Sequence, residues 1–203
     1  MGIIVNEDTA ILNVSYSDAN ERNKKEQEYL DYIKDHIAKV NEMFNLYFIP
    51  LLEESAISSL VSDEDLKLGI QELQTIINTH DASKFSDAEF DGYRAKYYPT
   101  LLEQNADTDY ILAMEDRYEQ CWIHHYTVND HHPMHWVNKE TGIPEDMTIR
   151  AIIEMLCDWE AMSLNFDTST VEWYQNKAID EKKAMSTTTR TIVEDLLFNV
   201  LHK

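Results

Sequence analysis

Histidines are concentrated in one part of this chain, since seven of the eight lie between residues 36 and 135. Imidazole is the commonest metal-ligating side chain and also exchanges protons near neutral pH. His80 and Asp81 place an imidazole beside a carboxylate, and His36 and Asp158 fall on the apolar faces of two other predicted helices. A lone histidine on an apolar face is usually a core residue. Four nitrogen and oxygen donors that converge from separate helices are instead typical of a metal site in a bundle.

The elements that must position these groups are predicted helices, because apolar residues recur around them at three- and four-residue steps. The first helix runs from about residue 18 to 48, with an inner face of Tyr29, Ile33, His36, Ile37, Val40, Phe44 and Tyr47. Pro50 is expected to end or kink it. Ser62 and Asp65 resemble a cap that opens a second helix. Its inner face reads Leu66, Ile70, Leu73, Ile77 and His80.

Five later helices are expected. Residues 86–89 have the spacing of a capping box for a short helix that runs toward Pro99, which leaves Lys84 in the preceding link. A further inner face consists of Ile111, Met114, Tyr118, Trp122 and His125, and residues 129–133 interrupt it. Pro144 suits the first turn of a helix that ends near Ser163. Amphipathic helices at 170–177 and 188–201 then close the bundle.

Composition agrees with an all-α fold. The 203 residues include only four Gly and four Pro, and 43% are hydrophobic, which fits one helical domain over residues 1–203. Residues 1–16 differ, because Ile3–Val5 and Ala10–Val14 are β-prone runs that could form an N-terminal hairpin appendage. Cys121 and Cys157 have no CxxC partner, so they are expected to be reduced core thiols.

The charge of −21 excludes several classes of partner. Such a field repels the phosphate backbone of duplex nucleic acid and anionic membrane surfaces. The chain also lacks an apolar run of the roughly 20 residues that a membrane span requires, and it lacks a signal-peptide pattern. We therefore expect a cytoplasmic protein.

The order of His36, His80-Asp81 and Asp158 resembles the H…HD…D signature of the HD superfamily of metal-dependent phosphohydrolases. The stretch from His80 to Lys84 is similar to the HD-x-G-K motif, with Ser83 in place of the glycine. The resemblance covers about residues 29 to 175. It is closest to an uncharacterised phage and bacterial branch, on the segments His80-Asp81-x-Ser83-Lys84-Phe85-Ser86-x-x-Glu89-Phe90, Asn129-x-His131-His132 and Glu154-Met155-x-Cys157-Asp158-Trp159-x-Ala161-Met162-Ser163.

This resemblance implies an HD-type helical bundle, in the cytoplasm of a bacterial or phage-infected cell, that holds one or two divalent ions (Mn, Fe, Mg, Co or Zn). The first ion would be held by His36, His80, Asp81 and Asp158, with Asp81 able to bridge to a second. The candidates for the second are His125, His131 and His132. His125 is preferred to His124 because it continues an apolar stripe, and the other ring would face solvent or support a ligand. A pair of His131 and His135 is a further alternative, which the intervening Pro133 disfavours.

Three residues are expected to take part in catalysis. Lys84 would contact a phosphate oxygen and offset charge in the transition state, although a solvated loop lysine is the alternative. Asp81 would hold the ions, and Glu154 would orient a ligand histidine or act as a general base, unless it is an exposed helix residue. Lys84, Asn129 and His124 are the expected substrate-binding residues.

The expected function is hydrolysis of a nucleotide or nucleotide-like phosphate ester, a small-molecule substrate, by a metal-activated water. A di-iron oxygenase would use the same ligands on an HD-type fold. A third alternative is a non-enzymatic acidic protein that binds a basic host partner. Homo-oligomerisation stays open.

Overall fold

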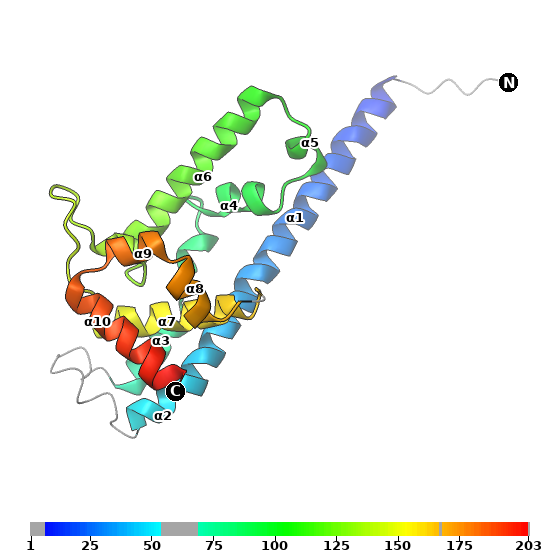
Figure 1. Ribbon diagram of the computed structural model, residues 1–203. Coiled ribbons are helices and arrows are strands. Elements are labelled where there is room, and N and C mark those ends of the chain that lie inside the picture. Colours follow the sequence, from blue (N-terminus) through cyan, green and yellow to red (C-terminus); the bar gives the residue numbers. More distant parts are fainter. Residues whose placement is uncertain (1–6, 54–68, 167, 203) are drawn as a thin grey trace. The chain divides into compact units, whose positions relative to one another are not determined.

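The computed structural model describes residues 7–53, 69–166 and 168–202, with side chains from residue 18 onward within these ranges (Figure 1). Its elements are helices joined by turns: α1 (Glu7–Met43), a π-helical turn (Phe44–Phe48), α2 (Ile49–Glu53), α3 (Ile70–Asn78), a 3₁₀ turn (Ala82–Phe85), α4 (Phe90–Tyr97), α5 (Leu101–Gln104), α6 (Thr108–Val128), a 3₁₀ turn (Pro133–Trp136), α7 (Ile149–Ser163), α8 (Thr170–Asn176), α9 (Ile179–Ala184), α10 (Thr187–Asp195) and a second π-helical turn (Leu196–Leu201).

The predicted all-α class is confirmed, because no strand or sheet occurs among the residues that the structure describes. Val137 and Pro144 form an isolated β-bridge. The prediction of an N-terminal hairpin is wrong in its second strand, because residues 10–14 lie in α1. The first strand, predicted at Ile3–Val5, lies outside the described residues. Neither Gly nor Pro occurs between Glu7 and Met43, so nothing stops the helix from propagating toward the N-terminus.

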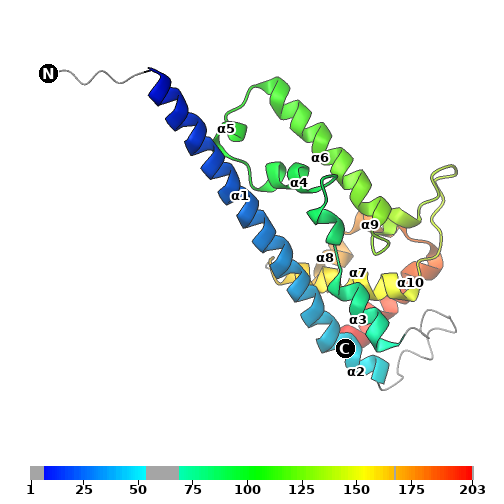
Figure 2. The same ribbon diagram turned by 180° about the vertical axis from the view of Figure 1, so that it is seen from behind.

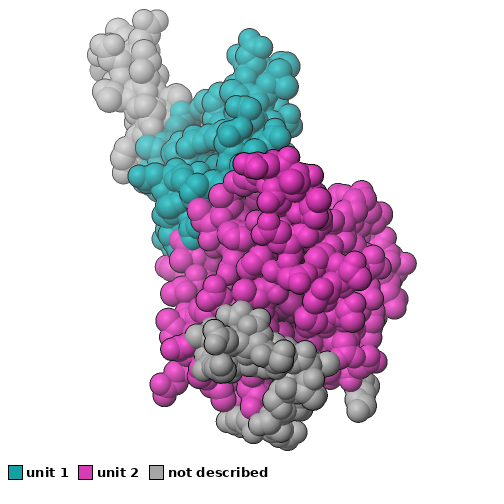
Figure 3. All heavy atoms as spheres, turned by 90° about the vertical axis from the view of Figure 1, so that its left-hand side faces the viewer, with its two compact units in different colours: residues 1–33, 83–124 teal, residues 34–82, 125–203 magenta. Residues whose placement is uncertain are grey.

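The chain forms two compact units (Figure 3). Unit 1 comprises residues 1–33 and 83–124, and unit 2 comprises residues 34–82 and 125–203. The prediction of one domain over residues 1–203 stays a prediction.

The core of unit 2 surrounds α7. Figures 1 and 2 both show α7 beside α3, α8 and α10, and α7 contacts each of these helices. Seven consecutive residues of α7, from Ala151 to Cys157, are buried. A helix that is buried all round needs partners on every side, and the π-helical turn after α1 supplies one with Phe44 and Phe48.

Unit 1 packs α4 against the first part of α1 and against α6. The ring of Tyr29 in α1 lies 5.2 Å from that of Phe90 and 5.7 Å from that of Tyr98. A Cβ placed on Gly92 would lie 2.3 Å from Cys121 Sγ, so only glycine allows α4 to approach α6 this closely. Cys121 and Cys157 are free and buried, as predicted.

The apolar faces predicted to be buried agree with the observed burial to different degrees. Tyr29, Ile33, His36 and Val40 are buried along α1, and Phe44 is buried in the π-helical turn that follows. Leu73 and Ile77 are buried in α3, and His80 is buried just after it. The expected face of α6 is partly wrong, because Ile111 and Trp122 are exposed. The Ser62 and Asp65 cap lies outside the described residues.

Pro50 does not end the first helical region. The chain passes from α1 through a π-helical turn into α2, and Ile49 N–H donates to the carbonyl of Phe44, five residues earlier. A proline lacks an N–H and its ring crowds the carbonyl four residues earlier, so a local change of helical pitch is a typical way to accommodate it.

Two predicted helix starts are wrong. The capping box at residues 86–89 does not form, because the Ser86 hydroxyl donates to the Ser83 carbonyl and α4 begins only at Phe90. The helix expected from Pro144 begins at Ile149, where the Thr148 hydroxyl accepts from Ala151 N–H. The preceding turn keeps Pro144 in the bridge with Val137. Ser86 therefore bonds to a neighbouring carbonyl instead of capping a helix, and Thr148, further along the chain than Pro144, caps α7.

The described helices include none with the length and apolar character needed to cross a membrane.

Candidate metal centre

Five segments of unit 2 bring the predicted metal ligands together. The inner face of α1 carries His36, the residues directly after α3 are His80 and Asp81, the end of α6 carries His125, the loop after α6 carries His131 and His132, and α7 carries Asp158. The loop is held by Trp136, whose indole N–H donates to the Asp130 carbonyl over 2.6 Å. His36, His80, Asp81, His125 and His131 are all buried.

Asp81 has an unusual backbone conformation, with φ of 55°. It is the one non-glycine residue with positive φ in the described part of the chain. Aspartate tolerates this left-handed region better than most residues, but the conformation still costs free energy and is found preferentially at functional sites. The sharp turn after α3 places the Asp81 carboxylate among imidazoles from three other segments.

A first set of donor atoms surrounds His36. Its Nε2 atom lies 3.2 Å from His80 Nε2 and 3.1 Å from Asp158 Oδ1. The Oδ2 atom of Asp81 lies 3.5 Å from His80 Nε2 and 3.8 Å from His36 Nε2. The four residues predicted for the first ion are therefore together.

A second set surrounds the other oxygen of the same carboxylate. Asp81 Oδ1 lies 3.2 Å from His125 Nε2 and 3.5 Å from His131 Nε2. One atom from each of Asp81, His125, His131 and His132 lies within 4.8 Å of the others. The two oxygens of Asp81 thus face different donor sets, which is the arrangement of a bridging carboxylate.

Glu154 supports one imidazole in each set. Its Oε1 atom lies 2.9 Å from His80 Nδ1 and 3.2 Å from His131 Nδ1. A carboxylate can only accept, so both Nδ1 atoms carry protons and both Nε2 atoms present lone pairs. A carboxylate that accepts from the distal nitrogen is the usual support of a metal-ligating histidine. Glu154 is buried, so it is not an exposed helix residue, and its role as the support of ligand histidines stays a prediction.

The chemistry of this donor set fits a divalent ion. With Nδ1 bound to Glu154, the lone pair of His131 Nε2 faces Asp81 Oδ1, another acceptor, and Nε2 has no hydrogen-bond partner among the described residues. Such contacts repel unless a cation lies between them. Ligand atoms about 2.0–2.2 Å from a shared ion are separated by roughly 3 to 3.5 Å, and the distances of the first set are close to this range.

Burial and neighbouring charges shift the pKa values of several residues in the cluster. Burial lowers the pKa of His80, but Asp81, Glu154 and Asp158 outweigh it and raise the pKa above its ordinary value. Burial opposes ionisation of Asp158, yet the hydrogen bond from His36 and the charges of His80 and His36 hold its pKa well below the usual range. Burial and the neighbouring His131 and His125 lower the pKa of His132, which favours the neutral, metal-binding form.

The predicted substrate-binding residues have other partners. Lys84 belongs to unit 1, where its ammonium lies 5.6 Å from the centre of the Tyr93 ring. His124 Nδ1 lies 2.7 Å from Oε1 of the buried Glu89. Their substrate contacts stay predictions. His125 Nε2 lies beside Asp81 Oδ1, whereas the choice of His125 over His124 as a metal ligand stays a prediction. His135 is exposed.

Arg150 was missed by the sequence analysis. It lies one turn before Glu154 and two turns before Asp158 on α7, so the three side chains share a face of this helix. Its guanidinium is partly exposed and lies 3.5 Å from the carboxylate of Asp130, next to the His131 loop. The four-residue spacing from Glu154 was visible in the sequence and could have revealed this cation.

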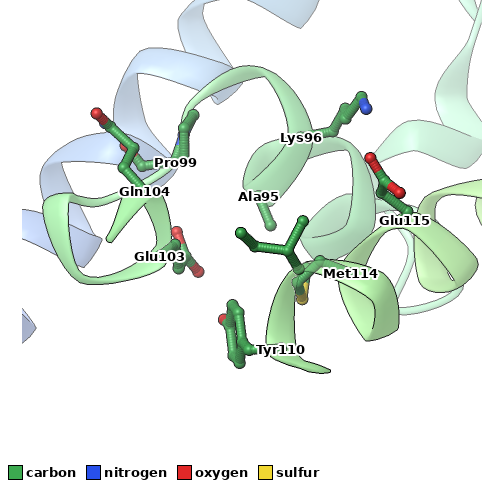
Figure 4. Close-up of a pocket in the computed structure, with 9 residues that line it drawn as sticks. Ala95, Lys96, Pro99, Glu103, Gln104, Tyr110, Met114 and Glu115 are labelled. Carbon is green, nitrogen blue, oxygen red and sulfur yellow. The ribbon is translucent and has the colours of Figure 1, made fainter. Parts of the chain in front are cut away.

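A hollow of about 200 Å³ occurs elsewhere, between α4, α5 and α6 of unit 1 (Figure 4). Its walls include Ala95, Pro99, Tyr110 and Met114, with Lys96 and Glu115 also lining it. It contains none of the predicted metal donors.

The fold and the cluster together define an all-α protein with a buried histidine and carboxylate site. The chain belongs to the family described as "Family of unknown function (DUF5662)", whose pattern matches residues 25–199. This range includes every residue of both donor sets. No curated protein and no solved structure matched the chain. Since the family description states no activity, the resemblance to HD phosphohydrolases stays a prediction.

Proposed function

We propose that this protein is a metal-dependent phosphohydrolase that acts on a nucleotide or a similar phosphate ester. The observation that carries the proposal is the placement of Asp81, whose Oδ2 faces His36 and His80 while its Oδ1 faces His125 and His131. Two donor sets that share one carboxylate are suited to a pair of divalent ions, and paired ions are common in enzymes that displace phosphate esters.

Bound divalent ions would supply a hydroxide nucleophile near neutral pH and would offset charge on the phosphoryl oxygens. The residues of the chain prepare for this chemistry. Glu154 keeps His80 and His131 in the tautomer whose Nε2 faces the donor sets. Asp81 and Asp158 add two negative charges in a buried site, which favours cations over neutral occupants.

Arg150 is the residue of unit 2 that we assign to substrate phosphate. Its fork of N–H donors matches phosphate oxygens, and its contact with Asp130 is long at 3.5 Å, so a phosphate can replace that contact. The phosphate contact expected of Lys84, a residue of unit 1, stays a prediction from the sequence. Arg150 and the ions would offset the net charge of −21, which repels a free nucleotide.

The abundance of imidazole favours particular metals. Magnesium and manganese suit oxygen ligands, whereas imidazole-rich sets favour Fe, Co or Zn, which narrows the metals expected from the sequence. The same preference admits the di-iron oxygenase as a second candidate. Oxygen uptake by iron-loaded protein, without phosphate release, would favour that reaction.

Metal content and hydrolysis test the proposal together. Protein purified without chelator is expected to contain about two ions per chain and to release phosphate from a nucleoside monophosphate, a nucleoside triphosphate or a cyclic dinucleotide. Asp81→Asn should retain less than one ion and lose at least about a hundredfold in rate. The matched control is Asp87→Asn, at an exposed carboxylate outside both sets. Full metal content in Asp81→Asn, or wild-type protein that binds no divalent ion, would refute the proposal.

A further inference from the structure

The amide of Asn129 contacts His125 in two ways. Its Nδ2 atom lies 2.8 Å from the backbone oxygen of His125 and 3.1 Å from the ring Nδ1 atom. A backbone oxygen only accepts hydrogen bonds, so the amide atom beside it must be the nitrogen. The opposite orientation of the amide would bring two oxygen acceptors to 2.8 Å. The contact with the carbonyl therefore identifies the donor.

This orientation determines where His125 carries its proton. An amide nitrogen only donates, so His125 Nδ1 accepts and carries no proton, and the neutral ring has its proton on Nε2. His80 and His131 are the opposite, because their Nδ1 atoms donate to Glu154. One buried cluster thus contains imidazoles in both tautomers, each imposed by a different neighbour.

We infer that His125 is a hydrogen-bond donor of the second donor set and not one of its metal ligands, and that Asn129 is the positioning residue that imposes this role. The Nε2–H group of His125 lies beside Asp81 Oδ1, at 3.2 Å between the heavy atoms. It is directed at an acceptor oxygen, either that of Asp81 or one of a bound phosphate ester. This inference rests on the proposed metal centre, and it replaces the sequence prediction that His125 is a ligand.

The inference makes the two sets unequal. The first keeps four protein donors, His36, His80, Asp81 and Asp158, whereas the second keeps only Asp81, His131 and His132. Fewer protein ligands leave more positions for solvent or substrate, which is typical of a catalytic ion. We therefore expect two separable affinities, the weaker one belonging to the second set.

The tautomers can be observed directly by long-range ¹H–¹⁵N NMR of protein labelled at histidine, with His125→Gln for assignment. In protein freed of metal, His125 should show a proton on Nε2, and His80 and His131 should show protons on Nδ1. On titration with Zn²⁺, His131 Nε2 should shift as a ligand while His125 Nε2 keeps its proton. A proton on Nδ1 of His125, or loss of its Nε2 proton on zinc binding, would overturn the inference.

Calorimetric zinc titrations provide the second test. His125→Ala should still bind two Zn²⁺ per chain, because it removes no ligand, whereas His131→Ala removes a ligand and should lose about tenfold or more at the weaker site. Asn129→Asp can only accept from the ring, so it should convert His125 into a ligand and tighten the weaker site about tenfold. This gain in zinc affinity should disappear in the double variant Asn129→Asp/His125→Ala if His125 becomes a ligand. A gain that persists in the double variant would come from the added negative charge alone.

Asn105→Asp is the matched control, since Asn105 Nδ2 likewise donates to a carbonyl four residues earlier, that of Leu101 in unit 1. It should leave both zinc affinities unchanged. These measurements do not depend on hydrolysis. If zinc binds with the expected tautomers but no phosphate ester is cleaved, the proposed function fails and the inference stands.

Discussion

At the scale of single residues, the site depends on which atom of each side chain meets which neighbour. The sequence analysis found the donors by their types and spacing, because His36, His80, Asp81 and Asp158 recur on separate predicted helices. The sequence left the role of Glu154 open and predicted His125 as a ligand. The roles of both residues depend on the positions of individual nitrogens, as in the contact between Asn129 Nδ2 and His125 Nδ1. Sequence spacing carries no information about ring tautomers.

The positive φ of Asp81 leads to a prediction about stability. In protein freed of metal, Asp81→Gly should be more stable than Asp81→Ala by about 1 kcal/mol, because glycine adopts the left-handed conformation without the cost that a Cβ imposes. Neither variant has the carboxylate, so the difference isolates the backbone. Urea denaturation followed by circular dichroism measures it.

The same pair of substitutions at Asp87 serves as the control. Asp87 is not among the described residues with positive φ. There the alanine variant should be at least as stable as the glycine variant. Equal stabilities of the two Asp81 variants would contradict the conformational explanation.

At the scale of elements, the periodic apolar faces predicted the inner sides of α1 and α3 and the end of α7 at Ser163. Helix starts were less predictable, since they depend on which serine or threonine caps a free N–H. Ser86 bonds instead to Ser83, while the real capping box of unit 1, Thr100 with Glu103, opens the four-residue α5. A helix of this length has too little apolar periodicity to be recognised.

Arg94 in α4 holds unit 1 together at a buried site. Its guanidinium donates from Nη2 to Glu103 over 2.6 Å and to Asp91 over 2.9 Å, and its side chain is 1% exposed. Burial raises the pKa values of Glu103 and Asp91, but the hydrogen bonds and charge of Arg94 outweigh it and lower both. Both acids therefore ionise more readily in the folded protein.

From this network we predict that Arg94→Met lowers the free energy of unfolding by about 3 kcal/mol at pH 7. Because the folded pKa values are depressed, the stabilisation is fully present above the unfolded values near about 4 and is lost as the pH falls through the folded ones. The difference between wild type and variant should therefore shrink below about pH 4. Urea denaturation from pH 7 to pH 3 measures it.

Arg190→Met is the control, since Arg190 forms an exposed pair with Glu194 four residues away. It should change stability by less than about 0.5 kcal/mol at any of these pH values. A pH-independent loss in Arg94→Met would show that lost packing, rather than charge, explains its effect.

At the scale of the whole molecule, the chain contains two compact units, and all the donor atoms belong to unit 2. Each unit combines segments that are distant in sequence, residues 1–33 with 83–124 and residues 34–82 with 125–203. No break in composition marks such a division, because it follows from which helices pack together. The all-α class was predictable from the scarcity of Gly and Pro, whereas the partition was not.

The location of the donors predicts where a chelator acts. A ligand that binds only the folded state stabilises it by about 2.7 kcal/mol at a hundred times its dissociation constant. Removal of metal should therefore increase amide hydrogen exchange in α3 and α7, whose ends and faces carry His80, Glu154 and Asp158. Exchange in α4 and α5, held by the Arg94 network of unit 1, should stay unchanged. Asp81→Asn, which lacks the shared carboxylate, should show no further change with chelator. An equal increase in both units, or none in α7, would contradict a metal centre confined to unit 2.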